Sequence, residues 1–281
     1  MITINDLNGL RAQVDTWRRG GNVAFVPTMG NLHDGHLSLV RAARTLADRV
    51  VVSIFVNPLQ FGVGEDFENY PRTLERDSAM LEGEGTDLLF APPVELIYPK
   101  PQDQQTRVEV PGLSGLLCGA SRPVHFVGVA TVVCKLFNMV QPDVALFGKK
   151  DFQQLMVIAR MVEDLAMPVR IVGVDTRRES DGLAMSSRNG YLTPDERAKA
   201  PMLYRVLGGL ADKLREGNSD YAGLQAQAAT ELDHLGFTTD YVAIRRAADL
   251  LAPSADEGEL VVLAAAHLGK ARLIDNIEVS R

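Results

Sequence analysis

The sequence predicts an α/β protein in which a doubly wound parallel sheet is followed by a smaller α+β domain. Two observations predict it. Short apolar runs rich in β-branched residues alternate with amphipathic helical patterns up to about residue 175, which is typical of parallel βαβ units. Beyond that point helical patterns come first and long apolar strands follow, a grouping typical of α+β domains. A length of 281 residues also suits two domains.

The first βαβ unit has the clearest pattern. The run 23–26 is continuously apolar and the run 50–56 is apolar except for Ser53, as expected for strands buried on both faces of a sheet. Between them, residues 35–48 place leucines and alanines on one helical face and arginines opposite or flanking. This order implies parallel strands joined by a right-handed crossover.

The alternation continues along the chain. We predict helices over 71–81, 126–140 and 152–165 and strands over 87–90, 143–147 and 169–174. Five strands separated by helices indicate a doubly wound sheet, and such sheets bind ligands outside the carboxyl ends of their strands.

The last third of the chain has a different organisation. Thr193-Pro-Asp-Glu196 predicts a helix start, because it combines an N-cap threonine, a proline at the first helical position and a glutamate three residues after the cap. We predict helices over 193–216 and 221–235, and strands over 240–244, 259–266 and 271–279, with a hairpin turn at 267–270. The first domain is therefore placed at residues 1–175 and a smaller α+β domain at residues 176–281.

Composition excludes several classes of protein. The formal charge is −7, from 29 basic and 36 acidic residues, so the chain as a whole repels nucleic acid. No apolar run reaches the ~18 residues that a membrane span needs, and the start of the chain lacks a signal-peptide pattern. Cys118 and Cys134 are too few for a disulfide framework and are expected to be buried thiols. We expect a cytoplasmic protein with neither nucleic acid nor membrane as a partner.

The most informative segment follows the first predicted strand: Pro27-Thr-Met-Gly-Asn-Leu-His-Asp-Gly-His36. It opens a helix, where free backbone N–H groups and the helix dipole favour an anion. His33 and His36 would lie on one face of this helix, and Gly30 and Gly35 allow the backbone to approach a ligand closely. The segment predicts an anion site. The alternatives are two incidental surface histidines, or a zinc pair that lacks an evident third ligand.

His33-Asp-Gly-His36 resembles the H-x-G-H motif of the class I aminoacyl-tRNA synthetase and nucleotidylyltransferase superfamily. The longer block 26–36 is similar to the pantoate–β-alanine ligase (pantothenate synthetase) family, and so are three further blocks. These are Phe55–Gly62 with Tyr70–Thr73, Leu146–Gln154 and Asp181–Asn189. H-x-G-H alone is a weak signal, whereas four blocks in the family's order are a strong one.

The resemblance implies a Rossmann-like first domain and an ATP-dependent ligase that works in two half-reactions. The carboxylate of pantoate attacks the α-phosphate of Mg-ATP, which releases pyrophosphate and leaves pantoyl adenylate. β-Alanine then displaces AMP to give pantothenate. The resemblance thus implies ATP as a substrate, Mg²⁺ as a cofactor and a homodimer. Positioning and charge stabilisation should dominate such a reaction.

The resemblance also implies roles for individual residues. His33 and His36 would contact the phosphates of ATP, with His36 as the candidate proton donor. Lys150 would reach a phosphate, and Ser186-Ser187-Arg188 would bind the leaving pyrophosphate. The full ATP-binding set is Met29, Gly30, His33, Gly35, His36, Gly148, Lys149, Lys150, Asp151, Met185, Ser186, Ser187 and Arg188.

Gln60 and Gln154 match the amide pair that the family uses for pantoate and β-alanine. A primary amide donates and accepts hydrogen bonds at once, which suits a substrate with hydroxyls and a carboxylate. Lys149 departs from the family, which commonly has Gln or Glu there, so it receives no individual role. His125 lies in a stretch that the family places near its active site, and an indirect role is left open.

An acidic patch that includes Asp66 and Asp77 precedes and enters a predicted helix. Asp77 is the leading candidate for a Mg²⁺ ligand, and a solvated helix face is the alternative. Two other functions are weighed: a nucleotidylyltransferase acting on a phosphorylated small molecule, and a non-catalytic nucleotide- or RNA-binding module. The amide pair argues against the first, because a phosphorylated substrate would require an extra basic cluster. The acidic total argues against the second.

Overall fold

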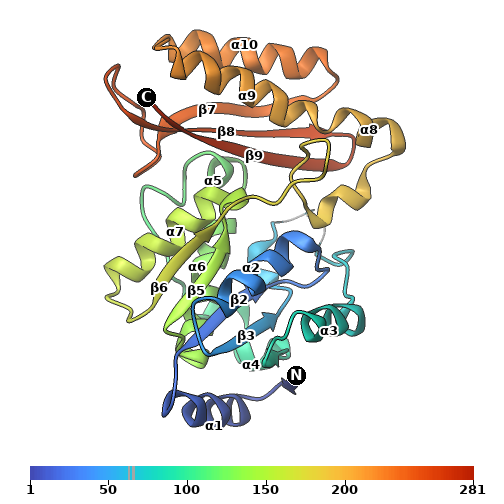
Figure 1. Ribbon diagram of the computed structural model, residues 1–281, viewed down its shortest axis with the longest axis vertical. Helices are drawn as coiled ribbons and strands as arrows, with labels where there is room; N and C mark the ends of the chain where they lie inside the picture. The colour runs from blue at the N-terminus through green and yellow to red at the C-terminus, as the bar shows by residue number, and fades with distance from the viewer. Residues whose placement is uncertain (63, 65–66) are drawn as a thin grey trace. The chain divides into compact units, whose positions relative to one another are not determined.

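The computed structural model describes residues 1–62, 64 and 67–281 and is shown in Figure 1. The chain forms two compact units. The first unit comprises Met1–Gly115, Gly119–Lys149 and Gln154–Asp175, and the second comprises Leu116–Cys118, Lys150–Gln153 and Thr176–Arg281. The first carries a six-stranded sheet and the second a three-stranded sheet, which confirms the predicted fold class.

The bounds of the elements are as follows. Up to residue 140 they are β1 (Ile2–Ile4), α1 (Leu7–Arg18), β2 (Val23–Thr28), α2 (Asp34–Arg44), β3 (Arg49–Ile54), η1 (Pro58–Gln60), α3 (Leu74–Gly83), β4 (Leu88–Phe90), α4 (Val94–Ile97), η2 (Gln102–Gln104), α5 (Cys118–Ser121) and α6 (His125–Val140). They continue with β5 (Val144–Gly148), η3 (Lys149–Asp151), α7 (Phe152–Asp164), β6 (Arg170–Val174), η4 (Ser187–Tyr191), α8 (Pro194–Lys199), α9 (Met202–Arg215), α10 (Tyr221–His234), β7 (Thr238–Arg246), β8 (Glu259–Leu268) and β9 (Ala271–Ser280).

The strands of the large sheet are all parallel and run in the order β1-β4-β3-β2-β5-β6. The direction in which successive strands are added reverses between β2 and β5, which pair directly through Ala24↔Val144 and Phe25↔Ala145. This reversal is the position where doubly wound sheets bind their ligands. The sequence patterns predict five of the six strands and miss β1, because a three-residue edge strand carries no readable periodicity.

Helices cover both faces of this sheet. Leu37 of α2 shares a core with Ala24 and Val26 of β2. On the opposite face, Phe25 meets Phe137 of α6 edge-on, with ring centroids 6.3 Å apart. Successive side chains of a strand point to opposite faces, so burial on both sides explains the continuous apolar run that predicts β2.

In the second unit, α9 and α10 lie on one face of the β7–β8–β9 sheet (Figure 1). The predicted helix start is confirmed: the N–H of Thr193 donates to Oε2 of Glu196 at 2.8 Å, and the N–H of Glu196 donates to Oγ1 of Thr193 at 3.3 Å. The predicted hairpin turn also forms, because Leu268 pairs with Ala271 across the turn.

Both cysteines are free thiols, but their burial differs. Cys118 is buried, as predicted, whereas Cys134 is partly exposed, so the expectation of two buried thiols is wrong for Cys134. Cys134 lies on the side of α6 that carries the exposed Asn138, whose Nδ2 donates to the carbonyl oxygen of Cys134 at 2.8 Å. Among the described residues, no helix combines the length and apolarity needed to cross a membrane.

The short helix η1 approaches α6 closely at Gly128. A Cβ atom on Gly128 would lie 2.1 Å from the carbonyl oxygen of Leu59 and 2.8 Å from the backbone nitrogen of Gln60. Nδ2 of Asn57 donates to the carbonyl oxygen of Gly128 at 3.0 Å. The absence of a side chain at Gly128 therefore allows the backbone that carries Gln60 to pack directly against α6.

The substitution Gly128→Ala is expected to destabilise the protein by about 1–3 kcal/mol, because the added methyl group would meet backbone atoms rather than a flexible side chain. Urea unfolding followed by circular dichroism measures the change. Gly83→Ala is the matched control at the last residue of α3, where a Cβ atom meets nothing within 4 Å, and should stay within about 0.5 kcal/mol of the parent. Equal losses in the two variants would contradict the close approach at Gly128.

Candidate active site

One buried carboxylate holds the segment that leads from β2 into α2. Asp77 of α3 is fully buried. It accepts the backbone N–H of Asn31 at 2.7 Å on Oδ2 and that of Leu32 at 3.0 Å on Oδ1. Oγ1 of Thr73 and the guanidinium of Arg76 donate to the same carboxylate at 3.0 and 3.2 Å. Asp77 thus positions the backbone of the motif, while its assignment as a Mg²⁺ ligand stays a prediction.

The turn above this carboxylate requires a glycine. Gly30 has φ of 78°, in the left-handed region that favours glycine. A Cβ atom there would lie 3.1 Å from Oδ2 of Asp77 and 3.1 Å from the side chain of Ile54. A side chain at residue 30 would therefore be strained by this φ and would require its neighbours on α3 and β3 to shift slightly.

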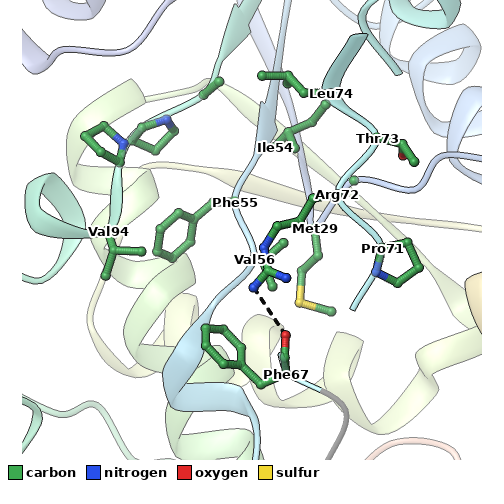
Figure 2. Close-up of a pocket in the computed structure, with 14 residues that line it drawn as sticks. Met29, Ile54, Phe55, Val56, Phe67, Pro71, Arg72, Thr73, Leu74 and Val94 are labelled. Carbon is green, nitrogen blue, oxygen red and sulfur yellow. Dashed lines mark hydrogen bonds between the residues drawn. The ribbon is translucent and has the colours of Figure 1, made fainter. Parts of the chain in front are cut away.

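A cavity of about 270 Å³ lies beside Met29 and Gly30. Its walls are mainly apolar, as Figure 2 shows. Among the described residues that line the wall, Arg72 is the one with a cationic side chain. It donates from Nη2 to the carbonyl oxygen of Phe67 at 3.2 Å. The cavity thus offers apolar contacts next to the glycine turn, and the guanidinium of Arg72 is held by the backbone around it.

His33 and His36 lie together at the start of α2, with ring centroids 4.1 Å apart. His33 is the N-cap residue and has extended backbone. Its backbone N–H donates to Nδ1 of His36 at 3.3 Å. Since Nδ1 accepts, the proton of a neutral His36 resides on Nε2, from which it can be donated to a ligand. The three-residue spacing therefore lets the imidazole of His36 accept the backbone N–H of the N-cap residue His33.

A second predicted segment lies at the same edge of the sheet. β5 runs parallel to β2, so extending their register by four residues brings Gly148 level with Thr28. A Cβ atom on Gly148 would meet nothing within 4 Å, which leaves open space beside the backbone. Nζ of Lys149 lies 3.0 Å from Oδ1 of Asp175, after β6. Lys149 thus has an ion-pair partner within the first unit. The sequence predicts no individual role for it.

The amide of Gln60 is oriented by Asn57, which is 1 % exposed. Oδ1 of Asn57 accepts the backbone N–H of Leu59 at 3.3 Å and the hydroxyl of Tyr98 at 2.7 Å. Nδ2 of Asn57 donates to the carbonyl oxygen of Gly128 at 3.0 Å and to Oε1 of Gln60 at 3.3 Å. A backbone N–H only donates and a carbonyl only accepts, which fixes the orientation of the Asn57 amide. Gln60 therefore turns its oxygen toward Asn57 and has its Nε2 donors available for a ligand.

Two further contacts hold the backbone of Gln60. Nδ1 of His125 lies 2.9 Å from its carbonyl oxygen, and Nη2 of Arg122 donates to the same oxygen at 3.4 Å. His125 therefore contacts the backbone of Gln60, and its indirect role stays a prediction. Burial raises the pKa of the Tyr98 hydroxyl, which keeps it a donor to Asn57. Sequence patterns do not predict Asn57 and Tyr98 as site residues, although Asn57 precedes a proline in the block Phe55–Gly62.

The adjacent glutamines at the start of α7 differ in burial. Gln153 is 4 % exposed. Its Oε1 accepts the backbone N–H of Cys118 at 3.1 Å, and its Nε2 donates to the carbonyl oxygen of Leu116 at 2.7 Å. Gln154, the predicted substrate-binding residue, is half-buried. Gln153 thus has a structural role, which leaves Gln154 as the candidate for substrate.

The remaining predicted residues belong to the second unit. Nζ of Lys150 lies 3.9 Å from Oδ2 of Asp151. Ser186 is the N-cap of η4, and its Oγ accepts the backbone N–H of Arg188 at 3.3 Å. Ser187 and Arg188 are half-buried in the first turn of η4. The Ser-Ser-Arg segment is therefore an ordered helical turn.

Asp181 anchors the chain just before this turn. Its carboxylate accepts from Nη1 of Arg197 at 2.6 Å and from the backbone N–H of Leu183 at 3.2 Å. The hydrogen bond from Arg197 holds the pKa of Asp181 below its ordinary value. The carboxylate therefore remains ionised, and holds the turn, through the neutral pH range.

The predicted residues form separate groups in the two units. In the first unit the histidine turn, Gly148 with Lys149, and Gln60 after β3 follow three neighbouring strands of one sheet. In the second unit Lys150 and Asp151 form one segment and residues 185–188 another. The acidic residue Asp66 lies outside the described residues. Within the described part of the chain, no group of three His, Cys, Asp or Glu side chains could hold a metal ion.

Removal of the Asp77 carboxylate is expected to loosen the turn after β2. Asp77→Ala should lower the free energy of unfolding by about 1–3 kcal/mol, because the backbone N–H groups of Asn31 and Leu32 lose their acceptor. Urea unfolding measures the loss. Glu75→Ala, at an exposed position on the same helix, is the control and should change stability by less than about 0.5 kcal/mol. An unchanged free energy of unfolding in Asp77→Ala would show that the turn does not depend on this carboxylate.

Comparisons with known proteins agree on one family. Residues 2–278 match the family described as pantoate-beta-alanine ligase. A pantothenate synthetase from Shewanella loihica is 58 % identical over 282 residues, covering 100 % of both chains. One from Colwellia psychrerythraea is 56 % identical and covers 100 % of this chain and 99 % of its own length.

Solved structures give the same result. A pantoate-β-alanine ligase (pantothenate synthetase) from Thermus thermophilus superposes with a TM-score of 0.93 at 50 % identity, covering 100 % of both chains. A pantoate-β-alanine ligase from Francisella tularensis, solved in complex with β,γ-ATP and β-alanine, gives a TM-score of 0.83 at 32 % identity and covers 99 % of this chain and 97 % of its own.

Proposed function

The chain belongs to the pantoate–β-alanine ligase family, and we propose that it joins pantoate to β-alanine in an ATP-dependent reaction that passes through pantoyl adenylate. The observation that carries the proposal is the paired imidazoles at the start of α2, next to the strand reversal between β2 and β5. A helix N-terminus with two added donors suits a polyphosphate.

In the first half-reaction, a carboxylate oxygen of pantoate attacks the α-phosphorus of ATP and the bond to the β-phosphate oxygen breaks. Charge develops on the phosphate oxygens, and fixed donors that face them stabilise it. Nε2 of His36 is such a donor, because its Nδ1 accepts the backbone N–H of His33. Lys150, Ser186, Ser187 and Arg188 are assigned to the leaving pyrophosphate by resemblance.

In the second half-reaction, the amine of β-alanine attacks the acyl carbon of the adenylate. The C–N bond forms, the C–O bond to AMP breaks, and a proton leaves the nitrogen. The Nε2 donors of Gln60, whose Oε1 is taken by Asn57, suit an oxygen of pantoate. Gln154 is assigned to the same substrates.

In the proposed reaction, Mg²⁺ binds together with ATP. Asp77 does not fit a metal ligand well, because it is fully buried and its oxygens accept from Asn31, Leu32, Thr73 and Arg76. Mg²⁺ keeps several waters and is commonly bound by substrate phosphates with one or two carboxylates. The described side chains therefore do not form a dedicated Mg²⁺ site, and the phosphates of ATP are its main ligands in this proposal.

We also propose that residues 1–175 form the ATP- and pantoate-binding domain and that residues 176–281 form a lid domain. The proposal includes a homodimer, which rests on the resemblance. A cytoplasmic location is supported by the use of ATP and by the two free cysteines. The family match over residues 2–278 disfavours both a nucleotidylyltransferase and a non-catalytic nucleotide- or RNA-binding module.

Pantoate-dependent release of pyrophosphate tests the role of His36. His36→Ala should lower the rate by about 10²-fold or more, because the donor facing the phosphates is lost. His234→Ala removes an exposed imidazole on α10 and should leave the rate unchanged. Near-normal release by His36→Ala would exclude the assigned role, and release that ignores pantoate would exclude the proposed substrate.

The orientation of the Gln60 amide makes a separate prediction. Gln60→Glu replaces the Nε2 donors with a carboxylate oxygen, so the KM for pantoate should rise about 10- to 100-fold. Gln104→Glu adds the same charge at an exposed position and serves as the control. An unchanged KM in Gln60→Glu would mean that Gln60 does not donate to pantoate.

A further inference from the structure

Two adjacent polar residues interrupt the apolar strand β9. Asp275 and Asn276 are 4 % and 8 % exposed. Successive side chains of a strand point to opposite faces, so Asp275 lies on the face that shares a core with α9, together with Leu273 and Ile277. Asn276 lies on the other face. Buried polar groups require partners, and each of these residues has one on a different segment of the candidate site.

Asp275 holds Arg178, which precedes the Met185–Arg188 segment. Nη1 and Nη2 of Arg178 donate to Oδ2 and Oδ1 of Asp275 at 2.6 and 2.8 Å. Nη1 also donates to the carbonyl oxygen of Gly182 at 3.1 Å, and the guanidinium lies 3.5 Å from the ring centre of Tyr204. A planar guanidinium with a bidentate partner and a stacked ring is fixed in both position and orientation.

The segment that Arg178 anchors is a turn whose two ends meet. Arg178 forms an isolated antiparallel bridge with Ala184. The backbone N–H of Met185 donates to the carbonyl oxygen of Arg177 at 3.0 Å. Ser186 follows directly, so the place of Arg178 sets the start of the Ser-Ser-Arg turn.

Asn276 holds the other segment. Its Nδ2 donates to the carbonyl oxygen of Lys150 at 2.9 Å. Its backbone N–H donates to Oδ1 of Asp275 at 2.8 Å, which links the two anchors. Neighbouring residues of one strand thus fix both segments of the second unit that carry phosphate-binding candidates.

We propose that Asp275 and Asn276 are positioning residues of the ligase reaction: β9 holds Lys150 and the Ser186–Arg188 turn in register, so that their donors meet the polyphosphate of ATP together. This rests on the proposed function. A displacement of about 1 Å in a substrate-positioning group can cost about 10²-fold in rate. The loss should appear in kcat for pyrophosphate release, because pantoate is assigned to Gln60 and Gln154.

Two variants separate positioning from folding. Asn276→Ala removes the bond to the Lys150 carbonyl and leaves the ion pair of Asp275. The double variant Arg178→Met/Asp275→Leu replaces the buried ion pair with apolar side chains, a change that is often neutral or stabilising. Ser280→Ala is the matched control on β9, since it removes only an exposed hydrogen bond to Glu259.

Pantoate-dependent pyrophosphate release and thermal unfolding are measured on all four proteins. The double variant is expected to unfold near the wild-type temperature, and Asn276→Ala somewhat below it, because the carbonyl oxygen of Lys150 loses a donor. Both test variants, assayed well below their unfolding temperatures, are expected to lose about 10²-fold in kcat and to keep the wild-type KM for pantoate; Ser280→Ala keeps both constants. A wild-type kcat in either folded variant overturns the proposal, as does a kcat loss that only parallels unfolding. A wild-type protein that releases no pyrophosphate with pantoate overturns the proposed function itself, and this inference with it.

Discussion

The direct pairing of β2 with β5 is the constraint on which the first unit depends. Parallel strands bring their carboxyl ends to one edge, and doubly wound sheets bind ligands in a crevice at that edge, where the strand order reverses. The pairing Ala24↔Val144 therefore brings the histidine turn after β2 and Gly148 after β5 to one place, although more than a hundred residues separate them. Gln60 joins them because β3 is the other neighbour of β2.

Buried polar side chains then hold each functional segment through its backbone. Asp77 accepts the N–H groups of the turn after β2, Asn57 holds η1, and Asn276 holds the carbonyl of Lys150. Such groups are costly to bury without partners, so each is stable in only one arrangement. In the proposed reaction, the side chains assigned to the substrates are other groups on these same segments.

Sequence patterns predict the fold class and most elements, because strands buried on both faces and amphipathic helices leave a continuous or periodic signal. They miss β1 and α1, since β1 has three residues and α1 buries only Leu10 and Val14. The candidate site is predicted where its residues are contiguous, as in His33 to His36. Asn57, Tyr98 and Asp275 are missed because each has a partner far along the chain: Asn57 contacts Tyr98 and Gly128, and Asp275 contacts Arg178. Asp77 is predicted as a candidate Mg²⁺ ligand, with a solvated helix face as the alternative. Its burial is not predicted, because it depends on Asn31 and Leu32 folding back onto α3.

The proposed reaction requires that the carboxylate of pantoate is adenylated. Pantoate labelled with ¹⁸O in its carboxylate, incubated with the enzyme, ATP and β-alanine, tests it through the mass of the AMP produced. One ¹⁸O atom is expected in AMP, because the oxygen that attacks the α-phosphate stays with it when the amine displaces the nucleotide. Unlabelled AMP, or ADP accompanied by labelled orthophosphate, would contradict adenylation.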